Sequence, residues 1–391
     1  MIPGGMDMEK KRVVLLGATG SIGQNSCAIL AANPEHFETV AVAARSSLDG
    51  LADAAVKLGA KVALTTDTAL ESELASRLPS SIKAASGMDE LLNIVTSKEV
   101  DIVVCAIIGT TGIRPVLAAI EAGKNIALAS KEVMVAAGDL VNAALKAHPE
   151  AQLLPVDSEH SGVFQCLAGR RTDEVDTIWL TASGGPFRNW SAEKIANATV
   201  AEALAHPTWN MGRKITIDSA SMMNKALELV EAKYLFAKYN AKLDVLVHPQ
   251  SAVHALIELT DGSLIAQCGY PDMKLPIAYA LSYPERLPFP GKRLSLAELK
   301  TLEFFAPDRK KFPAFSFADA ALEAGGTLPC AMNAANEIAV ERFCRGEINF
   351  GSIYRIIDCV MSNWHNEAQA SLEQLQIADT EARSKALEVR L

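Results

Sequence analysis

Over residues 12–156, short apolar runs alternate with longer segments in which apolar residues recur at helical spacing. Short apolar runs predict strands at residues 13–16, 39–43, 62–65, 101–107, 125–129 and 153–156. Between them, apolar residues recur at helical spacing, which predicts helices at residues 21–32, 48–58, 71–78, 113–122 and 132–147. Because parallel strands need crossover connections of this length, the pattern predicts an α/β fold with a Rossmann-like, doubly wound parallel sheet.

The pattern changes after residue 157. Apolar runs at residues 177–181, 215–217 and 245–247, a hairpin around Asp261 and Gly262, and one long helix over about residues 219–238 are typical of an α+β domain. A proline-rich stretch at residues 283–293 follows, and it indicates a linker because proline ends regular elements and stiffens connections.

Helical spacing returns in the last part of the chain, at residues 315–324, 331–345, 352–364 and 379–390. We therefore predict four segments: an α/β domain at residues 1–156, an α+β domain at 157–290, a linker at 291–312 and an α-helical domain at 313–391.

Composition narrows the classes of function. The chain has 391 residues and a formal net charge of -9, which argues against a nucleic-acid binder because such proteins normally carry a basic patch. A locally positive pocket for an anionic ligand stays compatible with that charge. The seven cysteines are scattered and form no Cys-x-x-Cys pair, which indicates free thiols in a reducing compartment.

No segment has the pattern of a membrane span or a targeting signal. The charge-free apolar stretch at residues 102–113 is about 12 residues long, whereas a bilayer crossing needs about 20. Residues 1–12 have neither the apolar core of a secretory signal nor the composition of a transit peptide. We therefore expect a cytoplasmic protein without a membrane partner.

A glycine-rich loop follows the first predicted strand. Gly17, Gly20 and Gly23 stand between a strand and a helix, where glycines permit a tight turn and the close approach of a pyrophosphate to the helix N-terminus. This context favours a dinucleotide site over a structural turn. The second strand is followed by Arg45 and two serines rather than an acid, which favours the 2′-phosphate of NADP over the free ribose of NAD. A solvated surface arginine is the alternative.

Two carboxylates follow the last strand of the α/β segment. In an extended segment Asp157 and Glu159 point the same way, and like charges this close are costly unless a cation shares them. Glu228 on the long helix offers a third carboxylate. Three carboxylates without cysteine suit a hard divalent ion such as Mg²⁺ or Mn²⁺. The alternative is that Asp157 and Ser158 cap a helix and Glu228 is a surface acid.

Other polar side chains suit a phosphate group. Ser183 follows a predicted strand, and Ser219 is expected to begin the long helix, on which Asn224 and Lys225 lie near Glu228. Residues 206–214 mix an indole, a glycine and two cations. They are interpreted either as a lid over an anionic ligand or as an ordinary surface loop.

Together these motifs resemble one family, the 1-deoxy-D-xylulose 5-phosphate reductoisomerases. Nine blocks run in the order of that family across nearly the whole chain, at residues 17–23, 130–132, 154–160, 183–188, 206–214, 218–228, 248–251, 271–273 and 332–337. The combination of PVDSEH at residues 155–160 with MMNKALE at residues 222–228 is the most specific part of the resemblance.

The resemblance implies an activity and an architecture. It implies the NADPH-dependent conversion of the sugar phosphate 1-deoxy-D-xylulose 5-phosphate to 2-C-methyl-D-erythritol 4-phosphate, the committed step of non-mevalonate isoprenoid synthesis. Mg²⁺, Mn²⁺ or Co²⁺ would assist the reaction. The enzyme would be a homodimer with an N-terminal NADPH domain, a central domain for catalysis and dimerisation, and a C-terminal helical bundle.

The resemblance also implies roles for individual residues. The metal would be bound by Asp157, Glu159 and Glu228, which form the catalytic group together with Lys131 and His206. The sugar chain would be contacted by Lys131, Ser158 and Glu159. The substrate, chiefly its phosphate, would be held by Ser183, His206, Ser219, Asn224 and Lys225. Trp209 would close over the substrate as a lid. The cofactor site would be lined by Thr19, Gly20, Ser21, Ile22, Arg45, Ser46, Ser47, Ser130, Glu132 and Gly212.

Two other functions are weighed against this one. A different NADP-linked dehydrogenase, acting on a hydroxy acid or a semialdehyde acid, would turn over without rearranging the carbon skeleton and without an absolute need for metal. A non-catalytic NADPH sensor would not need the Asp-Ser-Glu and MMNKALE residues.

Overall fold

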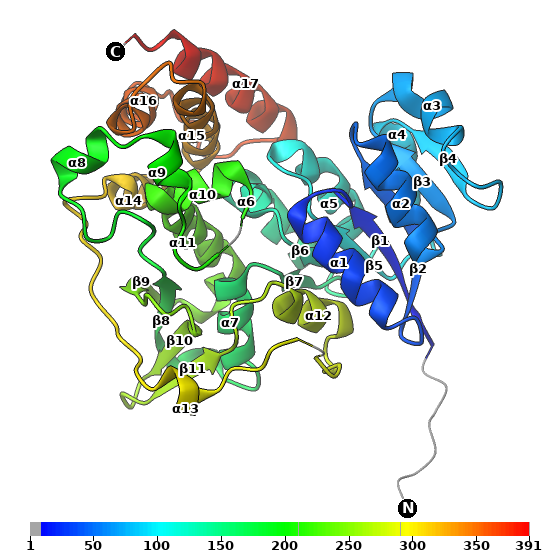
Figure 1. Cartoon of the computed structure of the whole chain (residues 1–391), viewed down its shortest axis with the longest axis horizontal. Helices are drawn as coiled ribbons and strands as arrows, with labels where there is room; N and C mark the ends of the chain where they lie inside the picture. Colours follow the sequence, from blue (N-terminus) through cyan, green and yellow to red (C-terminus); the bar gives the residue numbers. More distant parts are fainter. Residues whose placement is uncertain (1–8, 210, 290, 391) are drawn as a thin grey trace, which may run out of the picture. The chain divides into compact units, whose positions relative to one another are not determined.

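The computed structural model describes residues 9–209, 211–289 and 291–390 (Figure 1). Their contacts divide them into two compact units. The first unit comprises the described residues within 1–130, 141–157 and 273–291, and the second comprises those within 131–140, 158–272 and 292–391. The division into domains at residues 156, 290 and 312 stays a prediction.

The first unit is built on a seven-stranded sheet. Its strands are β1 (Lys11–Leu16), β2 (Phe37–Ala44), β3 (Val62–Thr65), β4 (Lys83–Ser86), β5 (Ile102–Cys105), β6 (Asn125–Leu128) and β7 (Leu153–Pro155). They lie in the order β4-β3-β2-β1-β5-β6-β7, and all neighbouring pairs are parallel. The predicted doubly wound sheet is confirmed. The strand order reverses between β1 and β5, and ligands of such sheets bind at this point, beyond the carboxyl ends of the strands.

Helices connect these strands. The α-helices are α1 (Ser21–Ala32), α2 (Leu48–Leu58), α3 (Glu71–Ala75), α4 (Met88–Thr96), α5 (Ile113–Glu121) and α6 (Lys131–Ala147). Short 3-10 helices are η1 (Thr68–Leu70) and η2 (Thr110–Gly112). Helices α1 and α2 have the predicted bounds. Strand β4 and helix α4 were not predicted, because the sequence Lys-Ala-Ala-Ser of β4 lacks the branched and aromatic residues that identify a strand.

Helix α12 (Lys274–Ser282) returns late in the sequence to the first unit, where it packs against α1. Lys11 of β1 holds its C-terminal end. The Nζ atom of Lys11 donates to the carbonyl oxygens of Leu281, Ser282 and Tyr283, at 3.2, 3.0 and 2.7 Å. A cation at this position satisfies carbonyl groups that have no partner within the helix and complements the helix dipole.

The second unit contains a four-stranded sheet against which helix α7 (Ser158–Cys166) packs. The strands are β8 (Val175–Ala182), β9 (Lys242–Val247), β10 (Val253–Leu259) and β11 (Leu264–Cys268), in the order β11-β10-β8-β9. Strand β10 is antiparallel to β8 and β11, and β9 is parallel to β8. Helix α7 packs against β10 and β11. The predicted hairpin at Asp261 and Gly262 joins β10 to β11.

The other helices in the middle of the chain are η3 (Thr172–Glu174), α8 (Ala192–Ala196), α9 (Val200–Leu204), α10 (Arg213–Ala220), α11 (Met223–Leu235) and η4 (Ala237–Tyr239). The prediction of one helix over residues 219–238 is wrong. Met222 has a φ of 60°, in the left-handed region, and Ser221 Oγ accepts a hydrogen bond from Met223 N at 3.3 Å. These features end one helix and begin the next. The apolar run at residues 215–217, which suggested a strand, lies inside α10. So short an apolar run does not distinguish a strand from a helix.

The C-terminal helices are α13 (Leu296–Leu299), α14 (Ala314–Ala324), α15 (Leu328–Cys344), α16 (Gly351–Ser362) and α17 (Leu372–Glu388). Helix α15 packs against α16 and α17, and the three lie side by side in the orange and red part of Figure 1. The predicted helical segments are confirmed, although α17 begins earlier than expected because Ser371 forms a capping box. Among the described residues, none of the helices combines the length and apolar character that crossing a membrane requires.

Candidate active site

Three carboxylates meet where β7 leads into α7. Asp157 directly precedes α7, Glu159 lies in its first turn, and Glu228 lies on α11. One oxygen from each carboxylate lies within 4.8 Å of the others. The expectation of an extended segment at Asp157 and Glu159 is wrong, because α7 begins at Ser158. The carboxylates converge by a different route, with α11 bringing Glu228 to the start of α7.

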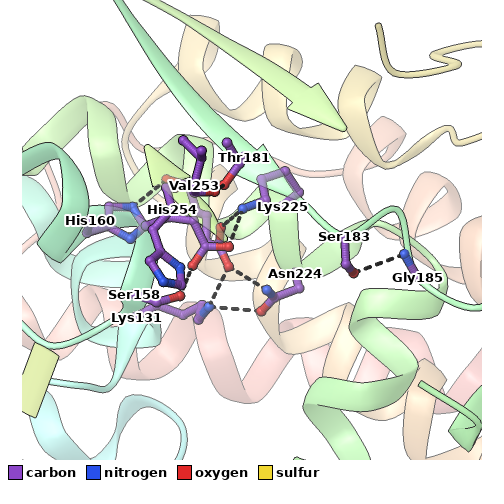
Figure 2. A network of polar contacts seen from close by, with 12 residues as sticks. Lys131, Ser158, His160, Thr181, Ser183, Gly185, Asn224, Lys225, Val253 and His254 are labelled. Carbon is purple, nitrogen blue, oxygen red and sulfur yellow. Dashed lines mark hydrogen bonds and ion pairs between the residues drawn. The ribbon is translucent and has the colours of Figure 1, made fainter. Parts of the chain in front are cut away.

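Two buried lysines neutralise part of this negative charge. The Nζ atom of Lys131 lies 3.1 Å from Glu228 Oε1 and 2.8 Å from Asn224 Oδ1. The Nζ atom of Lys225 lies 2.9 Å from Glu159 Oε1 and also contacts Glu228. Lys131, Asn224 and Lys225 point toward this common centre in Figure 2. Burial alone would lower the pKa of Lys225, but the carboxylates of Glu159 and Glu228 raise it above its usual value, so the lysine stays charged.

The donor set fits a hard divalent ion. With both lysines charged, the three carboxylates and two ammonium groups carry one net negative charge. Glu228 is 1% exposed, and Asn224 Nδ2 donates a hydrogen bond to its Oε1, which fixes the carboxylate. Carboxylate oxygens without thiolate or imidazole are the ligands that Mg²⁺ and Mn²⁺ prefer. Asp157, Glu159 and Glu228 would therefore hold the ion.

A buried histidine joins the two helices that carry Glu159 and Glu228. His160 Nε2 donates to the backbone carbonyl of Glu228 at 2.9 Å, and His160 Nδ1 lies 3.4 Å from Glu231 Oε2. Ser158 Oγ donates to Glu159 Oε2. No role was predicted for His160 or Glu231 from the sequence. The available signal was the spacing, since Glu231 follows Glu228 by three residues and shares its helix face.

Ser183 and His206 form a second polar group. His206 Nε2 lies 3.0 Å from Ser183 Oγ, and Gly185 N donates to the same Oγ at 3.2 Å. His206 Nδ1 accepts hydrogen bonds from the backbone N–H groups of Thr208 and Trp209, at 3.2 and 2.9 Å. The ring proton therefore lies on Nε2, which donates to Ser183. Burial lowers the pKa of His206, so the imidazole is neutral at pH 7.

The loop at Ser183 lies against the end of α10. Gly185 has a φ of 63°, and a Cβ atom there would lie 2.6 Å from the carbonyl oxygen of Ser219. Only glycine permits this approach, which brings the loop of Ser183 close to Ser219. The prediction that Ser219 begins the long helix is wrong, since it lies in the last turn of α10.

The loop between α9 and α10 contains the predicted lid. The ring of Trp209 lies 6.3 Å from that of His254, and Gly212 occupies the N-cap position of α10. Asn210 of this motif lies outside the described residues. Closure of the loop over a ligand stays a prediction.

The glycine loop has the geometry of a dinucleotide turn. Gly17 has a φ of 87°, and a Cβ atom there would lie 2.3 Å from Ala106 O, while one at Gly23 would lie 2.1 Å from Gly17 O. Gly20 caps α1 without a capping side chain, and the first turn of α1 contains no acid. These features leave the positive end of the helix dipole uncompensated by side chains, as anion binding requires.

The loop after β2 lies beside this turn. A Cβ atom at Gly50 would lie 3.0 Å from Ser47 Oγ and 3.2 Å from Thr19 Cγ2, which places Ser47 and Thr19 close together. Arg45, Ser46 and Ser47 are exposed at the carboxyl end of β2. The structure therefore places the two predicted cofactor loops next to each other.

The remaining predicted cofactor residues lie at the start of α6. Ser130 is its N-cap, and its hydroxyl donates to the carbonyl oxygen of Ile107. Glu132 is mostly buried, and its Oε1 lies 3.3 Å from Lys214 Nζ.

Comparisons with known proteins agree with one another. Models described as 1-deoxy-D-xylulose 5-phosphate reductoisomerase, its C-terminal domain and the DXP reductoisomerase C-terminal domain match residues 13–138, 153–236 and 268–385. The 1-deoxy-D-xylulose 5-phosphate reductoisomerase of Geotalea uraniireducens is 45% identical over 97% of this chain and 98% of its own length. That of Rhodospirillum centenum is 44% identical, over 97% and 94%.

Solved structures give the same result. The 1-deoxy-D-xylulose 5-phosphate reductoisomerase of Zymomonas mobilis in complex with NADPH has a TM-score of 0.90 and 42% identity, covering 97% of this chain and 98% of its own. A DOX-P reductoisomerase in complex with NADPH, fosmidomycin and magnesium has a TM-score of 0.89 and 38% identity, covering 96% and 97%.

Proposed function

Since the chain belongs to the 1-deoxy-D-xylulose 5-phosphate reductoisomerase family, we propose that Asp157, Glu159 and Glu228 hold the metal ion of its reaction. The enzyme converts 1-deoxy-D-xylulose 5-phosphate to 2-C-methyl-D-erythritol 4-phosphate with NADPH and a divalent metal, a step in isoprenoid precursor synthesis. Magnesium is the metal of this reaction, and we propose that Mn²⁺ or Co²⁺ substitutes for it. The convergence of three carboxylate oxygens within 4.8 Å is the observation that carries the metal assignment.

The chain's own groups prepare the reacting end of the substrate. When bound, the ion supplies Lewis-acid stabilisation of negative charge on oxygen, and NADPH supplies the hydride. Lys131 sits beside Glu228 and Asn224, where its ammonium group can donate to the sugar chain. Ser158 and Glu159, joined by a hydrogen bond, would contact the same part of the substrate.

The phosphate of the substrate is proposed to bind at the second polar group. The hydroxyl of Ser183 already accepts hydrogen bonds from His206 and Gly185, so its own proton is free to donate to an anion. Ser219 lies across the close approach at Gly185. Asn224 and Lys225, in the first turn of α11, pair with the carboxylates in this structure and would complete the phosphate site when the substrate is bound. Holding an unreactive phosphate here lets binding energy close the loop at Trp209 and orient the reacting end.

The cofactor is proposed to bind at the carboxyl end of the parallel sheet. Thr19, Gly20, Ser21 and Ile22 would present amide groups to its pyrophosphate. Arg45, with Ser46 and Ser47, would contact the 2′-phosphate, because the end of β2 contains no competing carboxylate. The other parts of the cofactor would be contacted by Ser130, Glu132 and Gly212.

We further propose that the enzyme is a homodimer. Strand β11 is an edge of its sheet, and Leu264 on it is 61% exposed. An exposed apolar edge strand offers unpaired backbone groups with which a strand of another chain can pair. Leu264→Lys should therefore give a monomer in sedimentation velocity, whereas the wild type sediments as a dimer. A wild-type monomer would contradict this proposal.

We also propose that the enzyme works in the cytoplasm. All seven cysteines are free thiols, which suits a reducing compartment.

One assay tests the function as a whole. Purified protein is mixed with 1-deoxy-D-xylulose 5-phosphate and NADPH, with and without a metal chelator, and the product is identified by NMR. We expect NADPH consumption that stops with chelator and a product with a branched carbon skeleton. Reduction without rearrangement would indicate an ordinary dehydrogenase, and NADPH binding without turnover would indicate a sensor.

A further inference from the structure

Helix α15 carries a polar motif, Asn-Ala-Ala-Asn-Glu at residues 333–337, that has no role in the site described above. Asn336 is completely buried, and its Nδ2 donates to Asp218 Oδ1 at 2.9 Å. Asp218 is 1% exposed and lies in α10. Burying an amide and a carboxylate is costly unless they are paired, so this contact stabilises one particular arrangement of α10 against α15.

The second oxygen of Asp218 extends the contact. Asp218 Oδ2 lies 2.9 Å from the Nζ atom of Lys214, one helical turn earlier, and the same Nζ lies 3.3 Å from Glu132 Oε1. Four side chains therefore form a continuous chain of polar contacts from α15 through α10 to the first turn of α6. We call Asn336, Asp218, Lys214 and Glu132 the α15–α6 chain.

The charges of this chain keep Lys214 protonated. Burial alone would lower the pKa of Lys214, but Asp218, Glu132 and Glu337 raise it above its usual value. Glu337 is itself fixed by Arg383 of α17, at 2.6 Å. The ammonium group thus stays charged at neutral pH, paired on one side with Asp218, which Asn336 of α15 holds, and on the other side with Glu132.

Glu132 is adjacent in sequence to a residue of the carboxylate site. It directly follows Lys131, whose Nζ lies 3.1 Å from Glu228 Oε1. We propose that Asn336 and Asp218 are positioning residues that hold Lys214 against Glu132 and so fix the carboxylate that contacts NADPH. This inference rests on the cofactor assignment of the proposed function.

The test measures NADPH binding directly, by fluorescence titration of the full chain. Asp218→Asn removes the charge that holds Lys214 while keeping the shape of the side chain. We expect the Kd for NADPH to rise about tenfold, within the range of about 5- to 150-fold by which coupled sites change each other's affinity. The KM for NADPH should rise in parallel, and kcat at saturating NADPH should stay within about twofold. A matched control is Glu341→Gln, an exposed acid on the same α15, which should leave the Kd unchanged.

A second pair of variants separates positioning from general stability. Lys214 is 26% exposed, so replacing it disturbs the core less than replacing Asp218. Lys214→Met should raise the Kd for NADPH about tenfold, and Lys214→Arg should restore it to within about threefold of the wild type. Equal Kd values for Lys214→Met and the wild type would overturn the inference while leaving the proposed function in place. A wild type that binds no NADPH would overturn the cofactor assignment itself.

Discussion

Replacing Glu228 by glutamine tests the metal site most directly, because the change removes one charge and almost no volume. The three carboxylates and two lysines of the site carry one net negative charge, and Glu228→Gln makes the group neutral. Two unit charges about 4 Å apart in an effective dielectric of about 20 attract each other by about 4 kcal/mol, and the attraction to a divalent ion is at least that large. Because each 1.4 kcal/mol is about a factor of ten, the apparent affinity for Mg²⁺ should fall at least about a thousandfold.

The assay is the rate of NADPH oxidation with 1-deoxy-D-xylulose 5-phosphate over a series of Mg²⁺ concentrations. For Glu228→Gln we expect the Mg²⁺ concentration at the half-maximal rate (the Mg²⁺ midpoint) to exceed the concentrations that saturate the wild type. The Kd for NADPH should change by less than about twofold. Glu341→Gln, an exposed acid on α15, serves as the charge-matched control and should behave as the wild type. An unchanged Mg²⁺ midpoint in Glu228→Gln would refute the assignment of this carboxylate as a ligand.

Three further predictions concern Lys225, Lys11 and two histidines. Lys225→Met should raise the KM for 1-deoxy-D-xylulose 5-phosphate at least about tenfold, because a charged hydrogen bond contributes roughly 1.5–3 kcal/mol; steady-state kinetics with an unaltered KM would remove its phosphate role. Lys11→Met should lower the free energy of unfolding, measured by urea titration, by about 2 kcal/mol, because the charged hydrogen bonds to the end of α12 are lost. The control Lys10→Met, at an exposed neighbouring residue, should change the free energy of unfolding by less than about 0.5 kcal/mol. Burial lowers the pKa of His206 and of His248, so at mildly acidic pH the unfolded chain binds protons that the folded chain does not. The free energy of unfolding should therefore decline as the pH falls below about 6.5. Urea midpoints that stay constant between about pH 7.5 and 5.5 would contradict this.

The alternating segments of the first unit could be read from the sequence because their signals are local. Helices α1 and α2 follow the spacing of their own apolar residues, and Gly23 is required by its close approach to Gly17 within the same turn. The approach of Gly17 to Ala106, in contrast, joins distant parts of the chain. Strand β4 was missed because its residues are small and are placed in the sheet by β3 rather than by their own propensity.

The sequence names candidate site residues but does not reveal how they are arranged. The break at Met222 depends on a hydrogen bond of Ser221 and a left-handed backbone, which no periodic pattern reveals. That break decides where α11 begins and therefore which way Glu228 points. Contacts between distant segments were also invisible, since the approach of His160 to Glu231 depends on how α7 packs beside α11.

The late return of α12 to the first unit has a consequence for synthesis on the ribosome. The partners of Lys11 and the helix that covers α1 are translated only after the whole four-stranded sheet of the second unit. A nascent chain must therefore keep the first unit unfinished until residues 274–283 emerge. A protein cut short before this helix should expose the apolar side of α1 and be a target for proteolysis rather than an independently folded unit.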